Sequence, residues 1–410
     1  MLNPFLMSRK LIFLAILLAL TIAGQVYACT TAVISGRFTR DGRPLLWKNR
    51  DTGEPDNKVM YFTDGKYDYT GLVNSNDSLG KDVWIGMNAA GFAIMNSASY
   101  NLNPKEEADD AVNEGKVIKK ALQQCATVDD FEKLLKSLPV PHGLEANFGV
   151  IDAQGKGAFF ETSNRGYVKI DVNDPVAAPM GYLIRTNYSF TGKPDQGQGY
   201  IRYQTAERLF YQASATNNLT PEFILRDAAR CLYHSLTETD LALVQCSGKD
   251  KFVWFADYIP RYSTAASVVV QGVKKNEPAL LATMWTVLGF PLCSVVCPVW
   301  LNDRHELPEL LKAGQSGTAP LCDKALALKE RCFPVRRGHG KDYLDLPVLI
   351  GSAGDGILQK LAVVEKEIFL ETNNALGSWR KTPPTATAIK QEYDTLDRMI
   401  TEAYQRLFGL

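Results

Sequence analysis

The segment QVYACTTAVISG, residues 25–36, joins two very different parts of the chain. Before it lie a basic pair and an uncharged apolar run, LIFLAILLALTIAG. This order is typical of a secretory signal peptide, and Val26 and Ala28 supply the small side chains that a signal peptidase requires. We therefore expect a signal peptide over residues 1–28 and a mature chain that begins at Cys29.

The residues from Cys29 onward have the composition of β-strands. CTTAVISGRFT is rich in Thr, Val and Ile, an Asp41-Gly42 turn follows, and PLLWKNRDT returns. A second pair, DVWIGMN and GFAIMNSAS, is joined by a turn at residues 89–91. The two pairs predict an antiparallel sheet that starts at Cys29.

Helices and further strands follow in alternation. Residues 115–126 have helical periodicity, and Thr127 with Asp130 forms a capping-box pattern that opens the next helix. Pro221 favours a helix start and predicts a helix over 221–236. Strand patterns occupy residues 146–152, 158–162, 167–172 and 263–273.

The C-terminal part changes character. Residues 357–376 and 388–408 each carry a helical apolar stripe, and RKTPPT between them is a turn. We expect a main domain over 29–350 and a helical hairpin within 351–410 that packs on it.

One long apolar run resembles a membrane span. Residues 279–301 contain no charged side chain and are long enough to cross a bilayer. Gly289, Pro291 and Pro298 interrupt the run, with short β-rich pieces between them. We expect buried strands and a loop here, and no stable membrane span after signal cleavage.

Charge and cysteine content narrow the range of partners. The chain has 45 basic and 45 acidic residues, so no basic field exists to hold nucleic acid. Its eight cysteines all lie in the part expected to be exported, where disulfides persist, but spacing does not fix their pairing. Without a CxxC pair or clustered histidines, the sequence predicts no metal site and implies no cofactor.

A cysteine at a new N-terminus combines two chemical groups in one residue. Its α-amino group, with a pKa of roughly 7.7–8.0, can accept the thiol proton and return it to a leaving amine. Three other interpretations stay open: a structural or disulfide-bonded cysteine, a different cleavage point, and a lipid-modified cysteine. Tyr27 is bulky for a lipidation motif.

Several segments, in order, carry a resemblance. CTTAVISG, LLWKNRDT, WIGMNAAGFAIMNSASYN, NFGVID, GYLIRTNYSF and RYSTAASVVV resemble the N-terminal-nucleophile amide hydrolases. That superfamily includes choloylglycine hydrolase, penicillin V acylase and the isopenicillin N acyltransferase-like branch, which fits best. The resemblance implies an α+β fold, the αββα four-layer sandwich, in which the nucleophile opens a central strand.

The resemblance also implies roles around Cys29. Asp51 would hold the α-amino group, and a basic residue would favour the thiolate. Bile salt hydrolases place an arginine three residues before the aspartate, whereas this chain has Lys48 there and Arg50 directly before Asp51. Strand alternation puts Lys48 and Arg50 on one face, and we favour Arg50.

Further roles follow from the same pattern. Asn96 and Asn187 match the asparagines that donate to the oxyanion, and Arg261 matches a late arginine that supports the site. A strand-end asparagine bonding its own backbone and a solvated arginine are the simpler alternatives. Five aromatic residues near these positions would line an acyl pocket or belong to the core: Trp47, Trp84, Tyr100, Tyr188 and Phe190.

We therefore expect a secreted or periplasmic cysteine hydrolase that cleaves a linear, non-peptide amide C–N bond in a small molecule, with Cys29 as nucleophile. An acyltransferase of the same fold is one alternative. An inactive binding protein, lipid-anchored through Cys29, is the other. The sequence leaves the substrate, the disulfide pairing and the oligomeric state open.

Overall fold

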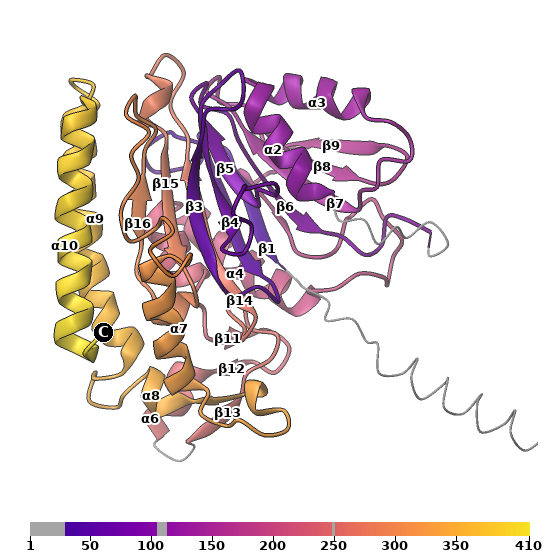
Figure 1. Ribbon diagram of the computed structural model, residues 1–410. Helices are drawn as coiled ribbons and strands as arrows, with labels where there is room; N and C mark the ends of the chain where they lie inside the picture. Colours follow the sequence, from indigo (N-terminus) through magenta and orange to yellow (C-terminus); the bar gives the residue numbers. More distant parts are fainter. Residues whose placement is uncertain (1–28, 105–112, 248–250) are drawn as a thin grey trace, which may run out of the picture.

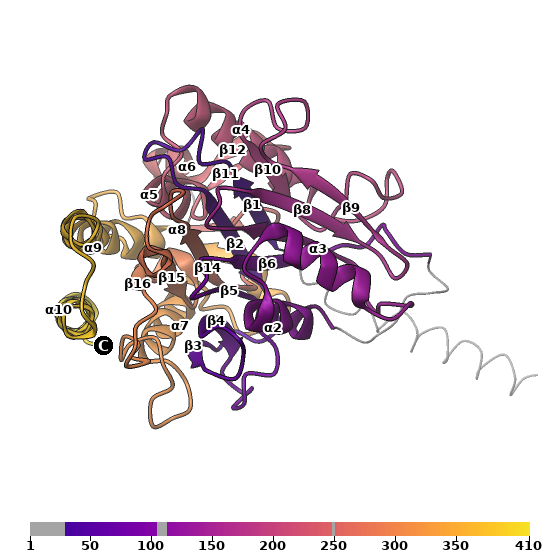
Figure 2. The ribbon, with the colours of Figure 1, turned by 90° about the horizontal axis from the view of Figure 1, so that it is seen from above.

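The computed structural model describes residues 29–104, 113–247 and 251–410 (Figure 1). The expected signal peptide, residues 1–28, lies outside the described residues. Within those ranges, two antiparallel sheets face each other, and helices cover the outer face of each (Figures 1 and 2). The αββα arrangement implied by the resemblance is confirmed.

In the described residues the first sheet has six strands, in the order β10-β1-β2-β14-β15-β16. They are β1 (Thr30–Ile34), β2 (Leu45–Asp51), β10 (Tyr182–Arg185), β14 (Thr264–Gln271), β15 (Thr283–Leu288) and β16 (Cys297–Val299). Strand β1, which follows Cys29 directly, lies between β10 and β2, so Cys29 stands at the start of an interior strand.

The second sheet, over the same part of the chain, has seven strands in sequence order. They are β3 (Asn57–Phe62), β4 (Tyr69–Asn74), β5 (Ile85–Asn88), β6 (Ala93–Ala98), β7 (Ala146–Ile151), β8 (Gly157–Thr162) and β9 (Tyr167–Asp171). Strands β6 and β7 face β1 and β2 across the core. The two strand pairs expected in one sheet therefore belong to opposite sheets, because side chains on both inner faces are apolar enough to be buried together.

Among the described residues, two helices cover the seven-stranded sheet: α2 (Glu114–Gln124) and α3 (Val128–Ser137). The expected capping box is confirmed, because the Thr127 side chain accepts from the backbone N–H of Asp130 and the Asp130 carboxylate accepts from that of Thr127. A separate apolar cluster fills the space between these helices and the sheet, with Phe131 at its centre against Phe148 and Phe160.

The remaining elements gather around the six-stranded sheet. The helices are α4 (Tyr200–Ala215), α5 (Pro221–Phe223), α6 (Leu241–Ser247), α7 (Pro320–Cys332), α8 (Leu346–Leu349), α9 (Ile357–Trp379), α10 (Ala386–Phe408), the π-helix η2 (Ile224–Ala228), and the 3-10 helices η3 (Ala279–Leu281), η4 (Pro291–Cys293) and η5 (Gly340–Asp342). Short strands pair as β11 (Tyr233–His234) with β12 (Thr239–Asp240) and β13 (Phe252–Trp254) with β17 (Tyr343–Asp345).

The last two helices lie side by side, seen nearly end-on in Figure 2. Helix α9 packs Phe369 against Trp285 of β15, with ring centroids 5.1 Å apart. Trp300, just after β16, contacts Trp379 of α9 and Tyr393 of α10. The helical pair is therefore joined to the edge of the six-stranded sheet by large aromatic contacts.

The apolar run at 279–301 forms η3, β15, η4 and β16, as buried strands and loop. Among the described residues, no helix combines the length and the apolar character that crossing a membrane requires.

The helix expected over 221–236 was wrong beyond residue 228. Arg230 turns its side chain toward Glu365 and the carbonyl oxygens of Pro291 and Ser294, and the chain then enters β11. These long-range contacts override the local helical pattern.

Candidate active site

The strand register places Cys29 beside two cations. Thr30 pairs with Asn49 and Thr31 with Lys48. Cys29, one residue before Thr30, therefore lies opposite Arg50. Because side chains alternate along a strand, Cys29 shares the face of Thr31, whose hydroxyl lies 3.5 Å from that of Ser97 on β6. Cys29 therefore lies on the face between the two sheets, where its side chain is buried.

Lys48 reaches across this space to β6. Its ammonium group donates to the backbone oxygen and to Oδ1 of Asn96, both at 2.7 Å. Burial lowers the pKa of Lys48 to about 8, and the charge of Cys29 is the largest influence in the opposite direction. The Lys48 ammonium group therefore places a positive charge that interacts with Cys29.

Arg50 lies on the same face, as strand alternation predicts, but has other partners. Its guanidinium donates to Oδ1 of Asn57 and, at 2.7 Å, to Oδ1 of Asn74, and stacks 4.8 Å from the Trp84 ring. Burial lowers the pKa of Arg50 to about 10, and Cys29 again opposes the change most strongly. Both candidate cations therefore act electrostatically on Cys29, and only Lys48 also holds Asn96.

The two asparagines are each held through their carbonyl oxygen by a cation. Lys48 occupies Oδ1 of Asn96, and among the described residues the Nδ2 of Asn96 makes no hydrogen bond. Oδ1 of Asn187 accepts from Arg202 at 3.2 Å, while its Nδ2 donates to the carbonyl oxygen of Ala98 at 2.7 Å. This orientation turns the amide N–H groups of both asparagines away from the cations.

Asp51 ends β2, one residue beyond the position opposite Cys29. Its carboxylate accepts from Nε and Nη2 of Arg261 at 3.0 and 2.8 Å, and from Thr264 at 2.6 Å. Burial opposes the charge on Arg261, but Asp51 outweighs it and raises the pKa of Arg261. Arg261 therefore fixes the Asp51 carboxylate at the end of β2, one position beyond the residue opposite Cys29.

Sequence reasoning missed Arg202, which lies on α4. Its Nη1 donates to the backbone oxygen of Cys29 at 2.6 Å and to the hydroxyl of Thr30 at 2.8 Å. Full burial lowers the pKa of Arg202 to about 10. No sequence motif marks this residue, because its contacts depend on how α4 docks on β1 and β10.

Glu114 at the start of α2 was also missed. It is 7% exposed, and burial raises the pKa of Glu114 to about 7. In the described part of the chain its Oε2 has no hydrogen-bond partner, and the charge of Lys48 acts against the rise in pKa. Glu114 is therefore a buried carboxyl group that titrates close to neutrality beside the proposed site.

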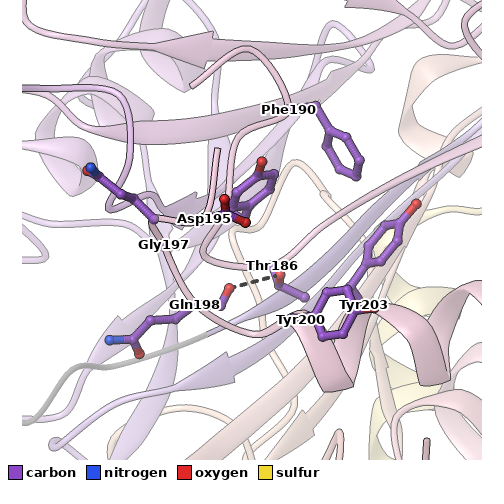
Figure 3. Close-up of a pocket in the computed structure, with 9 residues that line it drawn as sticks. Thr186, Phe190, Asp195, Gly197, Gln198, Tyr200 and Tyr203 are labelled. Carbon is purple, nitrogen blue, oxygen red and sulfur yellow. Dashed lines mark hydrogen bonds between the residues drawn. The ribbon is translucent and has the colours of Figure 1, made fainter. Parts of the chain in front are cut away.

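The aromatic candidates divide between core and cavity. Trp47 packs on Phe210 inside the core, whereas Tyr188 and Phe190 line a cavity of about 420 Å³ adjoining Asn187. Figure 3 shows Tyr200 and Tyr203, from α4, together at one side of the cavity, and the ring of Tyr203 contacts that of Phe190, with centroids 5.3 Å apart. This aromatic lining suits an apolar acyl group.

No cluster of three or more His, Cys, Asp or Glu side chains suited to a metal ion occurs in residues 29–104, 113–247 and 251–410. The sequence left the cysteine pairing open, and among the described cysteines Cys293 lies 3.7 Å, Sγ to Sγ, from Cys332.

Residues 38–254 match the family described as acyl-coenzyme A:6-aminopenicillanic acid acyl-transferase. The chain belongs to this family, within the N-terminal-nucleophile hydrolase superfamily. The matched part includes Lys48, Asp51, Asn96 and Asn187; it begins after Cys29 and ends before Arg261.

Solved structures of similar proteins include the Caenorhabditis elegans ortholog of N-acylethanolamine-hydrolyzing acid amidase, at 13% identity and a TM-score of 0.38, covering 59% of this chain and 92% of that one. A variant of conjugated bile acid hydrolase from Clostridium perfringens is 13% identical, with a TM-score of 0.37 and coverage of 68% and 94%. Penicillin V acylase from Agrobacterium tumefaciens is 11% identical, with a TM-score of 0.36 and coverage of 67% and 86%. Among curated proteins, none matches the chain.

Proposed function

We propose that the protein is a secreted or periplasmic cysteine amidohydrolase that cleaves a linear, non-peptide amide C–N bond. The observation that carries this proposal is the position of Cys29, at the start of an interior strand, between the cation Lys48 and the ion pair of Asp51 with Arg261. A thiol surrounded by cations is a stronger candidate for a thiolate nucleophile than a structural cysteine in an apolar core.

In the proposed reaction, removal of residues 1–28 frees the α-amino group of Cys29. This amine accepts the thiol proton, and sulfur forms a bond to the amide carbonyl carbon while the carbonyl π electrons move to oxygen. Asn96 and Asn187 donate to the resulting oxyanion. Collapse breaks the C–N bond, the ammonium group protonates the leaving amine, and an acyl-thioester remains on Cys29.

Water completes the cycle. A water molecule attacks the thioester carbonyl carbon while the α-amino group accepts a proton from that water. The C–S bond then breaks, and the acid product leaves. An acyltransferase would instead pass the acyl group to a second amine, and the description of the matched family favours testing for this. Added amine acceptors with product analysis separate the two reactions.

We assign the basic residue at the nucleophile to Lys48 rather than to the Arg50 favoured from sequence. Lys48 is the cation that both acts on Cys29 and orients Asn96, whereas Arg50 is bound to Asn57 and Asn74. One cation would thus serve the thiolate and the oxyanion donor together.

The test uses protein exported from a cell that cleaves its leader, with linear amides of aliphatic and arylacetyl acids. Hydrolysis is expected for the wild type and lost in Cys29→Ala, while Cys231→Ser, a half-buried thiol elsewhere, stays active. A folded wild type that binds these amides without ever turning them over supports an inactive binding protein. Membrane attachment lost in Cys29→Ser supports the lipid anchor.

A further inference from the structure

Phe190 and Tyr200 expose large rings at the aromatic cavity of Figure 3. Phe190 is 52% exposed and Tyr200 is 66% exposed. Single exposed rings are common on protein surfaces, but these two line the same cavity. The ring of Phe190 also meets the rings of Tyr188 and Tyr203 edge to face, with centroids 5.6 and 5.3 Å apart. Phe190 therefore belongs to an aromatic surface that is open to a ligand.

Helix α4 connects this aromatic surface to the proposed nucleophile. Tyr200 and Tyr203 line the cavity, and Arg202, on the same turn of the helix, donates to the backbone oxygen of Cys29. A substrate whose acyl group lies on the rings can therefore place its amide carbonyl close to Cys29.

A buried ion pair supports the ring of Phe190. The carboxylate of Glu161, on β8 of the seven-stranded sheet, accepts from Nε of Arg185, on β10 of the six-stranded sheet, at 2.6 Å. The side chain of Glu161 is 0% exposed and that of Arg185 is 7% exposed. The Arg185 guanidinium lies 4.4 Å from the centroid of the Phe190 ring. The pair therefore joins the two sheets and supports one face of that ring.

The same carboxylate fixes the backbone that carries the ring. It accepts from the backbone N–H groups of Phe190 at 3.1 Å and of Thr191 at 2.7 Å, and from the Thr191 hydroxyl. Each oxygen of this buried carboxylate thus has hydrogen-bond donors. Glu161 therefore holds Phe190 twice, directly through its main chain and through Arg185 at its ring.

Stability alone is a weak reason for such a pair. Removing two charges from water costs free energy that their attraction only partly offsets, and apolar side chains of similar volume often stabilise a fold as well. The groups that Glu161 and Arg185 bind belong to the loop beside the cavity. Their contacts therefore favour a role in fixing that loop.

The proposed oxyanion donor Asn187 is held by other contacts. Its Oδ1 accepts from Arg202, and its Nδ2 donates to the carbonyl oxygen of Ala98. The hydroxyl of Ser189, which follows in the same loop, donates to Oδ1 of Asn147 at 2.7 Å. Loss of the ion pair should therefore loosen the aromatic surface and leave the oxyanion donor in place.

We propose that Glu161 is a positioning residue for acyl-group recognition, which with Arg185 holds Phe190 against the acyl group of the amide substrate. The held ring favours bulky apolar acyl groups over acetyl. This inference rests on the proposed amide hydrolysis. Phe190 contacts the substrate, whereas Glu161 and Arg185 act through Phe190.

The test compares phenylacetyl, octanoyl and acetyl amides of one amine. We expect Glu161→Gln and Phe190→Ala each to raise KM for the two bulky amides at least about tenfold, with kcat nearly unchanged and a smaller effect on the acetyl amide. Phe190→Tyr retains the ring and should retain the preference for bulky groups. Two controls should not alter that preference: Glu365→Gln, which breaks another buried ion pair, and Tyr211→Ala, which removes an exposed ring of α4 outside the cavity.

A double-mutant cycle separates positioning from a purely structural role. If Glu161 acts through Phe190, adding Glu161→Gln to Phe190→Ala raises KM for the phenylacetyl amide no further. Additive effects in this cycle overturn the inference while amide hydrolysis stands, as do equal KM values for bulky and acetyl amides in the wild type. If Glu161→Gln does not fold, Glu161→Gln combined with Arg185→Met, which removes both charges, takes its place in the cycle.

Titration of the same amides into Cys29→Ala measures the acyl preference without turnover. If no amide is hydrolysed by the wild type, tighter binding of the phenylacetyl amide that depends on both Phe190 and Glu161 supports the inference. Equal binding of the phenylacetyl and acetyl amides overturns it.

Discussion

Nη1 of Arg202 donates a hydrogen bond to the backbone oxygen of Cys29 over 2.6 Å. The same guanidinium donates to Thr30 and to Oδ1 of Asn187. A single side chain from α4 thus fixes the proposed nucleophile relative to one proposed oxyanion donor. We regard Arg202 as a positioning residue, because its contacts are with Cys29 and Asn187 rather than with a reacting atom.

Arg202→Met is expected to lower kcat by about 10²-fold or more with a smaller change in KM, because misplacing the nucleophile affects the transition state more than binding. Arg202→Lys should recover part of the loss, since a lysine still reaches one of the three acceptors. Steady-state kinetics measures both effects. Arg208→Met, on the exposed face of the same helix, serves as control. If Arg202→Met lowers the melting temperature but leaves kcat unchanged, Arg202 has only a structural role.

Lys48→Met is expected to slow the alkylation of Cys29 at pH 7, because the variant lacks a cation that attracts negative charge on the sulfur. The measurement is the rate of alkylation by iodoacetamide against pH, with the modified residue located by peptide mapping. The alkylation rate at pH 7 should fall in Lys48→Met and fall less in Arg50→Met. If Arg50→Met has the larger effect on alkylation, Arg50 and not Lys48 is the basic residue at the nucleophile.

Glu114→Gln is expected to change how stability depends on pH. The folded chain keeps the Glu114 proton up to a pKa of about 7, whereas the unfolded chain releases it near the ordinary 4.5. The free energy of unfolding of the wild type therefore falls as pH rises between these values, by up to about 3 kcal/mol from this group. Urea unfolding at pH 5 and pH 8 should show the fall reduced in Glu114→Gln and unchanged in the exposed-site control Glu402→Gln. If the free energy of unfolding depends on pH equally in all three proteins, Glu114 does not have the raised pKa.

Glu365→Ala is expected to destabilise the fold by about 3–5 kcal/mol, because it leaves the buried Arg230 without its carboxylate. Arg230 and Glu365 form a bidentate pair that links α9 to the segment after η2. Thermal or urea unfolding measures the loss, and Glu367→Gln, exposed on the same helix, is the matched control. A loss no larger than that of the control would mean that α9 is held by its aromatic contacts alone.

Local patterns in the sequence predicted the elements that depend on neighbouring residues. The Asp41-Gly42 turn lies between β1 and β2, with Gly42 at a φ of 77°, and the capping box at Thr127 opens α3. The sequence patterns did not predict strands β3 and β4 or helix α7. The expected helix over 221–236 failed because Arg230 binds a carboxylate 135 positions away.

The site residues also divide into those that local patterns predicted and those that depend on distant contacts. Alternation along β2 predicted that Lys48 and Arg50 share a face, and the contacts of both with the opposite sheet agree. Their ranking required distances to Asn96, which lies on another sheet. Arg202 carries no motif, because it reaches Cys29 and Asn187 only when α4 docks against distant strands.

The most direct measurement of the central claim is peptide mapping by mass spectrometry of the exported protein, quenched during turnover of a slowly hydrolysed amide. The account predicts an N-terminal peptide that begins at Cys29 and carries the acyl group of the substrate as a thioester. An acyl group on another residue, no acyl group despite turnover, or an N-terminus other than Cys29 would contradict it.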